Sequence, residues 1–142
     1  MADQDPVGLL SSVPLFSGCT KKELQAIARA TKEVNHKGGA VIAREGEKGM
    51  GFFLILDGTA RVSVGGRSRA KLGPGDYFGE IALLEDVPRT ATVIAEGDVG
   101  LYSLARRDFQ DLLARSAAFH QTVSTVSAAR EMDLRTKLVA GA

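Results

Sequence analysis

The sequence has no tryptophan, one cysteine and two histidines among its 142 residues. The single thiol, Cys19, cannot form an internal disulfide, which is typical of a protein from a reducing compartment. Lys21 and Lys22 are the only basic residues near it, which favours an inert loop thiol over a redox centre. His36 and His120 are not at the spacing of metal ligands, which would be clustered histidines with a carboxylate. The sequence therefore gives no support to a metal-dependent enzyme.

Long apolar runs, a secretion signal and an excess of one charge are also missing. No stretch approaches the roughly 18 apolar residues of a membrane-spanning helix, and residues 1–10 lack the basic start and apolar core of a signal peptide. With 18 basic and 17 acidic residues, the net charge of +1 gives no global field that attracts nucleic acid or an anionic membrane. No Gly-x-Ser-x-Gly stretch indicates a nucleophile. We expect a cytoplasmic protein without catalytic activity, metal or cofactor, and without direct contact to membrane or DNA.

The length and the 44% of hydrophobic residues fit a single domain, residues 1–142. Its first part, residues 1–33, is expected to be helical: a short helical piece and a turn lie within residues 6–16. A second helix follows. Thr20 and Glu23 have the spacing of a capping box, so that helix begins there and ends near Thr31.

Glycine dominates the middle of the chain, where thirteen of the sixteen glycines fall between residues 38 and 100. They separate short apolar or β-branched runs, a pattern typical of many short antiparallel strands in a sandwich or barrel. Asp57-Gly58 and Gly65-Gly66 are predicted to be hairpin turns. Within a β-roll over residues 34–105 we expect strands near residues 40–43, 51–56, 59–64, 68–72, 89–95 and 99–104.

After residue 104 there is no glycine until Gly141, and helical periodicity returns. Phe109, Leu112 and Leu113 lie at helical spacing, and Ser116 is placed to cap a second helix. Residues 106–138 are therefore predicted to form two C-terminal helices.

Residues 78–93 hold an acid and a base close together in the chain. Gly79 permits a tight turn, Glu80 follows, and residues 81–84 form an apolar run about one helical turn long, whose first amides suit an anion. Pro88 then fixes the approach to Arg89, which we expect at a strand entrance facing the turn. A guanidinium fork fits phosphate oxygens, and a carboxylate accepts from sugar hydroxyls, so one site can hold a phosphate and a ribose. A structural ion pair between Glu80 and Arg89 is the alternative, although desolvation makes it a poor stabilising device.

The motif FGEIALL at residues 78–84, followed by RTATV at residues 89–93, resembles the phosphate-binding cassette of the cyclic nucleotide-binding domain family. The resemblance implies that Arg89 pairs with the cyclic phosphate and that Glu80 holds the ribose 2′-hydroxyl. It also implies supporting roles for the turn glycine and for backbone amides of the cassette: Gly79, Ile81, Ala82 and Ala91.

The resemblance extends over about residues 15–113, because two further motifs match the family. They are FFLIL with the following Asp-Gly at residues 52–58, and Gly-Pro-Gly-Asp at residues 73–76. It implies a mainly β fold, an eight-stranded antiparallel jelly roll with N-terminal helices and two C-terminal helices.

Thr90 bears on which nucleotide is bound. Its hydroxyl can touch a phosphate oxygen or the amino group of a syn guanine, which adenine lacks. A threonine here resembles the cGMP-selective kinase sites of the family, whereas bacterial members often combine Ser or Thr with cAMP. We favour cAMP, keep cGMP as the alternative, and note that Thr90 also suits a strand by propensity alone.

Purine recognition must come from side chains outside the phosphate and sugar contacts. The candidates are strand residues and residues of the last helix that would cap the base: Val62, Val64, Arg130, Leu134 and Arg135. Phe78, the first residue of the cassette, is a further candidate ligand-binding residue. A competing interpretation gives Arg130 and Arg135 ordinary surface pairs with Glu131 or Asp133.

These patterns predict a sensor or regulatory domain that couples cyclic nucleotide occupancy to movement of its C-terminal helices. In the family such a helix closes over the base or pairs with its counterpart, so an effector protein and a homodimer through the last helix are expected partners. A sensor fragment of a cAMP-dependent transcription regulator, or of another effector, is the alternative. A helix-turn-helix has no room after the roll before Ala142, so we expect no specific DNA binding by this chain.

Overall fold

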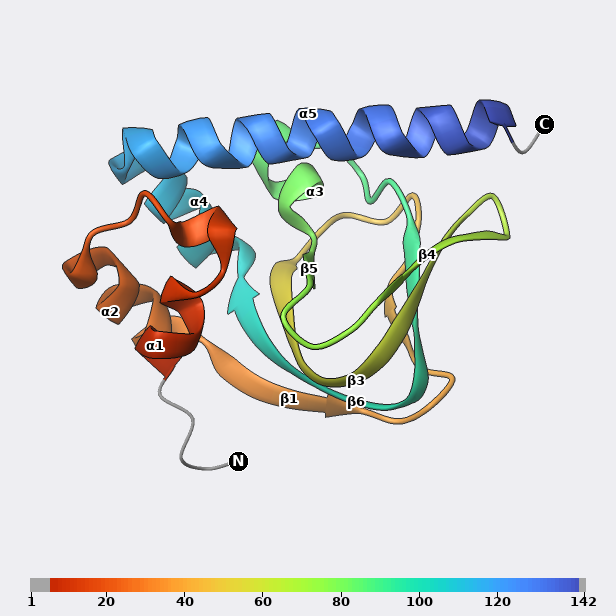
Figure 1. Cartoon of the computed structure of the whole chain (residues 1–142), viewed down its shortest axis with the longest axis horizontal. Coiled ribbons are helices and arrows are strands. Elements are labelled where there is room, and N and C mark those ends of the chain that lie inside the picture. The colour runs from red at the N-terminus through yellow and green to blue at the C-terminus, as the bar shows by residue number, and fades with distance from the viewer. Residues whose placement is uncertain (1–5, 141–142) are drawn as a thin grey trace.

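The computed structural model describes residues 6–140, and their side chains as far as residue 130. A β-roll fills one end of the molecule, helices gather at the other, and a long C-terminal helix crosses both (Figure 1). The elements in chain order are α1 (Pro6–Ser11), η1 (Pro14–Phe16), α2 (Lys21–Ala30), β1 (Lys32–His36), β2 (Val41–Ala43), β3 (Gly51–Val64), β4 (Arg67–Leu72), β5 (Tyr77–Phe78), α3 (Glu80–Glu85), β6 (Thr92–Ala105), α4 (Arg106–Arg115) and α5 (Ala117–Ala140).

The predicted helix starts are confirmed at two positions. The Thr20 hydroxyl accepts a bond from the Glu23 amide at 3.1 Å, and the Glu23 carboxylate accepts one from the Thr20 amide at 2.8 Å, which caps α2. The Ser116 hydroxyl accepts from the Phe119 amide at 3.2 Å, at the start of α5. The turn expected near Pro14 is a single turn of 3₁₀ helix.

The strands form one antiparallel sheet that rolls up on itself. Its order is β1-β6-β3-β4, with β2 also paired to β6 and β5 to β3. The predicted mainly β fold with flanking helices is confirmed. The predicted number of eight strands is not confirmed, since the described residues form six. β3 and β6 are long strands, and each runs through a region that was predicted to hold two.

The prediction of a hairpin at Asp57-Gly58 was wrong. Gly58 has a φ of +88°, and the β3–β6 register shifts on both sides of Asp57, so the strand bulges and continues. A Cβ on Gly58 would lie 2.3 Å from the carbonyl oxygen of Asp98, so the partner strand approaches too closely for any side chain. Gly65-Gly66, in contrast, does form the predicted turn, between β3 and β4, with φ values of 58° and 79°.

Strands β1 and β5 were not predicted. β1 carries one apolar residue, Val34, in the sequence KEVNH, and it pairs only along β6. β5 has two residues, too few for any alternation to be visible. Neither segment has the period-two pattern from which strands are predicted.

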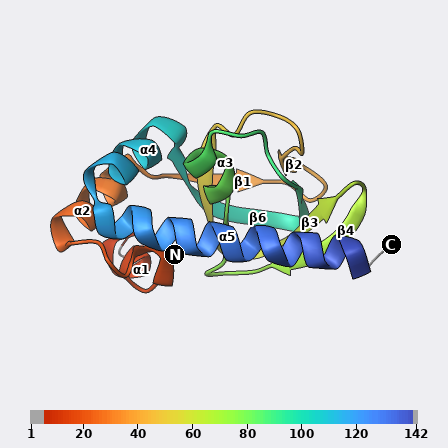
Figure 2. The same cartoon turned by 90° about the horizontal axis from the view of Figure 1, so that it is seen from above.

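A cluster of aromatic rings fixes α5 to the rest of the molecule. Phe119 is fully buried and stacks on Phe16 with ring centroids 5.4 Å apart, and it meets Phe109 edge-on at the same separation. Phe109 in turn stacks on Phe52 of β3 at 5.1 Å. This packing holds the first half of α5, whose second half extends over the roll toward β4 (Figure 2).

No helix within residues 6–140 combines the length and the apolar character needed to cross a membrane.

Candidate functional site

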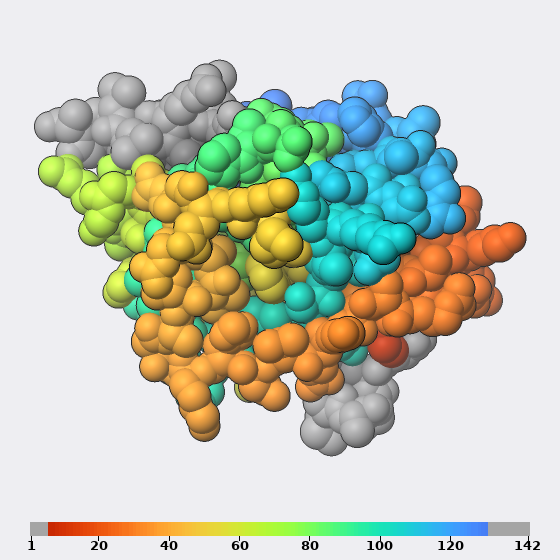
Figure 3. All heavy atoms as spheres, turned by 180° about the vertical axis from the view of Figure 1, so that it is seen from behind, coloured from red at the N-terminus to blue at the C-terminus, as the bar shows by residue number. Residues whose placement is uncertain are grey.

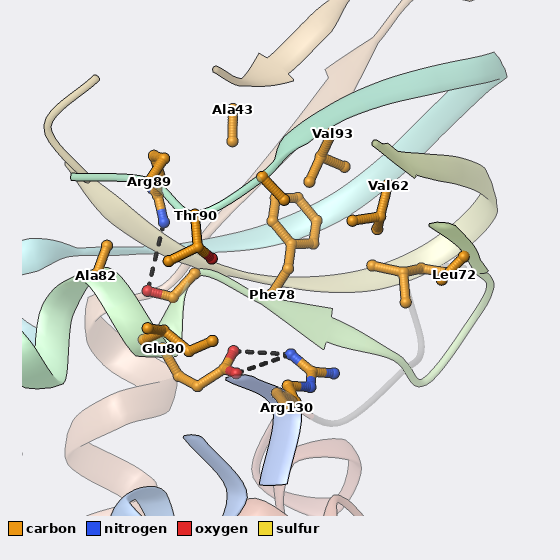
Figure 4. Close-up of a pocket in the computed structure, with 14 residues that line it drawn as sticks. Ala43, Val62, Leu72, Phe78, Glu80, Ala82, Arg89, Thr90, Val93 and Arg130 are labelled. Atoms are coloured by element: carbon orange, nitrogen blue, oxygen red, sulfur yellow. Dashed lines mark hydrogen bonds and ion pairs between the residues drawn. The ribbon is translucent and has the colours of Figure 1, made fainter. Parts of the chain in front are cut away.

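A cavity of about 270 Å³ opens in the roll beneath α5 (Figure 4). It draws its walls from β2 to β6, from α3, from the segment that follows α3, and from α5. The lining residues are Ala43, Val62, Ala70, Leu72, Phe78, Gly79, Glu80, Ile81, Ala82, Arg89, Thr90, Ala91, Val93 and Arg130.

Ten of the thirteen residues proposed from the sequence line this cavity. Val64 does not, although Val62 two positions earlier does. The side chains of Leu134 and Arg135 lie outside the described residues. The cavity thus brings the predicted cassette together with one predicted strand residue and one predicted residue of the last helix.

One wall of the cavity is a row of apolar side chains across three strands. Val62 of β3 lies opposite Val93 of β6 and Ala70 of β4, so the three stand side by side. Leu72 follows Ala70 by two positions and therefore faces the same way. Sequence reasoning missed Ala43, Ala70, Leu72 and Val93, although alternation along the predicted strands would have indicated the last three.

The polar end of the cavity is built on a short helix. Gly79 has a φ of +104°, a conformation that glycine adopts without strain, and it stands at the start of α3. Ile81 and Ala82 lie in the first turn of α3 and line the cavity. The first amides of a helix have no partner within it, so they are donors for a ligand.

The prediction that Arg89 stands at the entrance of a strand was wrong. β6 begins at Thr92, and the backbone of Arg89 pairs instead with the segment between β2 and β3, donating to Glu47 at 2.8 Å and accepting from Gly46 at 2.9 Å. Pro88 forms a bridge with Lys48 in the same segment. Residues 90 and 91 then connect this pairing to the start of β6 at Thr92.

Arg89 is 8% exposed as a whole residue, and its guanidinium is held by main-chain oxygens. Its Nη2 donates to the Gly51 carbonyl at 2.7 Å and its Nη1 to the Gly79 carbonyl at 3.3 Å. Burial lowers the pKa of Arg89, the Glu80 carboxylate opposes that shift, and the positive charge of Arg106 adds to it. The group still carries its charge, since arginine does not deprotonate in proteins. The cavity thus contains a buried cation with N–H groups to spare.

Glu80 is 1% exposed, and its partner is Arg130 of α5. Nη1 of Arg130 donates to both carboxylate oxygens, at 2.8 and 2.9 Å, and the guanidinium lies 4.4 Å from the ring centroid of Tyr77. The alternative of an ion pair between Glu80 and Arg89 was therefore wrong: among the described side chains, Glu80 is ion-paired to Arg130, fifty positions away. The other alternative, a surface pair of Arg130 with Glu131 or Asp133, involves side chains outside the described residues. Burial raises the pKa of the nearby Tyr77 phenol. The positive charge of Arg130 opposes this rise, and the negative charges of Glu80 and Asp76 add to it.

The side chains that face the cavity provide no metal centre. Among the described residues, no three His, Cys, Asp or Glu side chains gather as metal ligands. Cys19 lies elsewhere, half-buried beside α2, where burial raises its pKa to about 11 and Glu23 adds to the rise. A thiol in that state is a poor nucleophile.

The cavity thus combines a buried cation, a buried carboxylate and an apolar wall, an arrangement that suits a small ligand with an anionic group. Residues 33–116 match the model of the cyclic nucleotide-binding domain. The chain belongs to the cyclic nucleotide-binding domain family.

The chain is similar to proteins with different outputs. It is 43% identical over 108 residues to a cyclic nucleotide-gated potassium channel of Mesorhizobium japonicum, covering 76% of this chain and 30% of the channel. It superimposes with a TM-score of 0.76 on the regulatory domain of Toxoplasma gondii PKA crystallised with cAMP, at 30% identity, covering 87% of this chain and 49% of that one. It superimposes with a TM-score of 0.77 on the regulatory subunit of a cAMP-independent protein kinase A from Trypanosoma brucei, at 26% identity, covering 86% and 44%. The chain thus spans less than half the length of each.

Proposed function

We propose that this domain binds cAMP in the cavity beneath α5, performs no chemical step on it, and reports its presence through α5. The observation that carries the proposal is the shared location of Arg89 and Glu80, both buried, in the wall of one cavity whose opposite side is apolar. The volume of about 270 Å³ lies just below the usual range of small-molecule pockets, roughly 300–1,000 Å³.

The cyclic phosphate binds at Arg89. Two of the five guanidinium N–H groups are used by the carbonyls of Gly51 and Gly79, which leaves three for a ligand. The first amides of α3, at Ile81 and Ala82, and the amide of Ala91 add neutral donors. A buried, charge-assisted contact of this kind favours a phosphate over an uncharged group.

The ribose binds at Glu80, whose carboxylate accepts the hydrogen bond of its 2′-hydroxyl, and the purine packs on the apolar row of Val62, Ala70 and Val93. Arg130 lines the same cavity and contacts Glu80, so it lies close to the sugar as well as to the base. We infer that Arg130 acts as part of the cap over the nucleotide.

The choice of cAMP over cGMP is supported by the PKA regulatory domain crystallised with cAMP. Thr90 lines the cavity, so its hydroxyl is available to a guanine amino group as well as to a phosphate oxygen. The Trypanosoma relative is a regulatory subunit of a cAMP-independent kinase, so similarity of fold does not identify the ligand. The affinities for cAMP and cGMP therefore have to be measured directly.

Movement of α5 follows from the contact between Arg130 and the cavity. A ligand shifts α5 only by the difference between its affinities for the two helix positions. Because Arg130 meets the nucleotide only while α5 covers the cavity, an occupied site favours the covered position. The output passes from α5 to an effector protein or domain, and a homodimer through α5 is the second arrangement we propose.

Isothermal titration calorimetry with cAMP and cGMP tests the ligand and the site together. Arg89→Ala leaves a buried phosphate unpaired, which costs on the order of 3–5 kcal/mol, or roughly 10²–10³-fold or more in affinity. Arg61→Ala is the matched control, because Arg61 lies on the outer side of β3 in an exposed pair with Glu96. Unchanged cAMP affinity in Arg89→Ala, or no binding of either nucleotide at millimolar concentration, refutes the proposal.

A further inference from the structure

The segment between β2 and β3, residues 44–50, lies against the cassette on one side and against α4 on the other. Figure 3 shows it as a gold-to-yellow ridge between the green cassette and cyan α4. It pairs with the backbone of Arg89 through Gly46 and Glu47, as described above. The chain then continues through Gly49, Met50 and Gly51 into β3.

Gly49 lies directly against the guanidinium of Arg89. A Cβ built on Gly49 would lie 3.1 Å from Cζ and 3.2 Å from Nε of Arg89, and 2.8 Å from Cβ of Ala82 in α3. The first two distances are tighter than ordinary van der Waals contact, and the third is a clash. Gly49 is not among the glycines with positive φ, so its backbone conformation accepts any residue. Space for the side chain, and not backbone geometry, is what requires glycine here.

The neighbouring carbonyls hold the same guanidinium. Gly51 accepts from Nη2 of Arg89 at 2.7 Å, and Gly79 accepts from Nη1. Gly49 thus closes the side of the guanidinium near Cζ and Nε, while the two carbonyls fix its far end. The orientation of the fork determines which N–H groups face the cavity, and a bidentate phosphate contact depends on that orientation.

A second arginine fixes this stretch from behind. Arg106, at the start of α4, donates from Nη1 to the Gly49 carbonyl at 2.7 Å and from its backbone amide to the Met50 carbonyl at 2.9 Å. Its Nη2 bonds Asp86 at the end of α3. The carbonyls of residues 49–51 are therefore all used, two by Arg106 and one by Arg89, so the stretch cannot move without breaking one of these bonds.

We propose that Gly49 is a positioning residue for Arg89: its missing side chain provides the space in which the guanidinium takes the orientation that binds a phosphate. This deepens the proposed function and rests on it for the identity of the ligand. Gly49 touches no ligand itself and acts only through Arg89. Any side chain at this position turns the guanidinium or pushes α3 away from it.

The first test needs no ligand. In a ¹H–¹⁵N spectrum of the full chain, the Nε–Hε signal of Arg89 is identified by its loss in Arg89→Lys. Gly49→Ala is expected to shift or broaden that signal. Gly73→Ala is the matched control, because a Cβ there meets nothing within 4 Å and its φ is not positive. It should leave the signal in place.

The second test is calorimetry with cAMP on a double-mutant cycle. Gly49→Ala is expected to weaken binding at least about tenfold, which corresponds to about 1.4 kcal/mol, and to change affinity less than about twofold when Arg89 is already alanine. A coupled loss of this kind identifies action through Arg89, since a general loss of folding would appear in both backgrounds.

The outcomes separate the two proposals. An Arg89 signal that moves in Gly49→Ala, in a chain that binds no cyclic nucleotide, supports the positioning role and overturns the proposed ligand. A chain that binds cAMP equally well with Gly49→Ala, or loses the same affinity with and without Arg89, overturns the positioning role and leaves the proposed ligand standing.

Discussion

The two side chains of the Glu80–Arg130 ion pair differ in burial, and from this difference we predict how much each one contributes to stability. The Glu80 side chain is 1% exposed, whereas that of Arg130 is 33% exposed. Removing the guanidinium with Arg130→Met keeps the aliphatic stem packed near Tyr77 but leaves a buried carboxylate without its cation. Breaking a buried pair in this way costs about 3–5 kcal/mol. Because water already reaches Arg130, we expect a cost somewhat below that range, about 2–3 kcal/mol.

Glu80→Gln should cost less than Arg130→Met. The amide keeps the shape of the carboxylate, and the guanidinium left behind can turn toward solvent, so the expected loss is about 1 kcal/mol or less. Combining both changes should cost less than the sum of the two, because the uncompensated buried charge is then absent.

The free energy of unfolding in urea, without ligand, measures all three variants. Arg115→Met is the control, since Arg115 forms an exposed i,i+4 pair with Asp111, with 71% and 57% of the two side chains exposed. It should cost only about 0.3–0.5 kcal/mol. The reasoning is refuted if Arg130→Met costs no more than Arg115→Met, or if Glu80→Gln proves the more destabilising of the pair.

Two further predictions concern the cavity and the thiol. Thr90→Ala should weaken cGMP binding about tenfold more than cAMP binding, because only guanine has the amino group that a hydroxyl here can accept from, and loss of one such bond is worth about 1–1.5 kcal/mol. Parallel thermal shifts with both nucleotides measure it, and equal losses would contradict the hydroxyl–guanine contact. Iodoacetamide should modify Cys19 slowly at pH 8, because a pKa of about 11 leaves about a hundredfold less thiolate than the ordinary value of 9.0. Mass spectrometry of the single cysteine follows the rate, with urea-unfolded chain as the reference, and equal rates in both states would exclude the raised pKa.

The cassette could be predicted from sequence because its information is local. Gly79, Glu80 and Arg89 lie within eleven consecutive residues, and a tight turn, a helix start and a proline bring them to one place. The apolar wall was predicted only in part, at Val62. Its other members become visible once the pairing of β3 with β4 and β6 is known, since cross-strand neighbours are separated by many residues in sequence.

The errors have identifiable physical causes. Asp-Gly is a signal both for a hairpin turn and for a bulge, because each needs a residue with positive φ, and only the partner strand beside Gly58 decides between them. Arg89 was assigned to a strand because the residues after it are β-branched, whereas its backbone bonds go to Glu47 and Gly46. The partner of Glu80 lies fifty residues away on α5, and no periodicity in either segment indicates that contact.

The attachment of α5 by its first turns has a mechanical consequence. Phe119 fixes the helix to the aromatic cluster, and at 1.5 Å per residue Arg130 lies about 16 Å along the axis from it, with residue 140 about 31 Å away. A rigid rod pivoting at Phe119 doubles, at its tip, any displacement imposed at Arg130. In the helix movement proposed above, an ångström-scale displacement at Arg130 would therefore become a stroke about twice as large at residue 140.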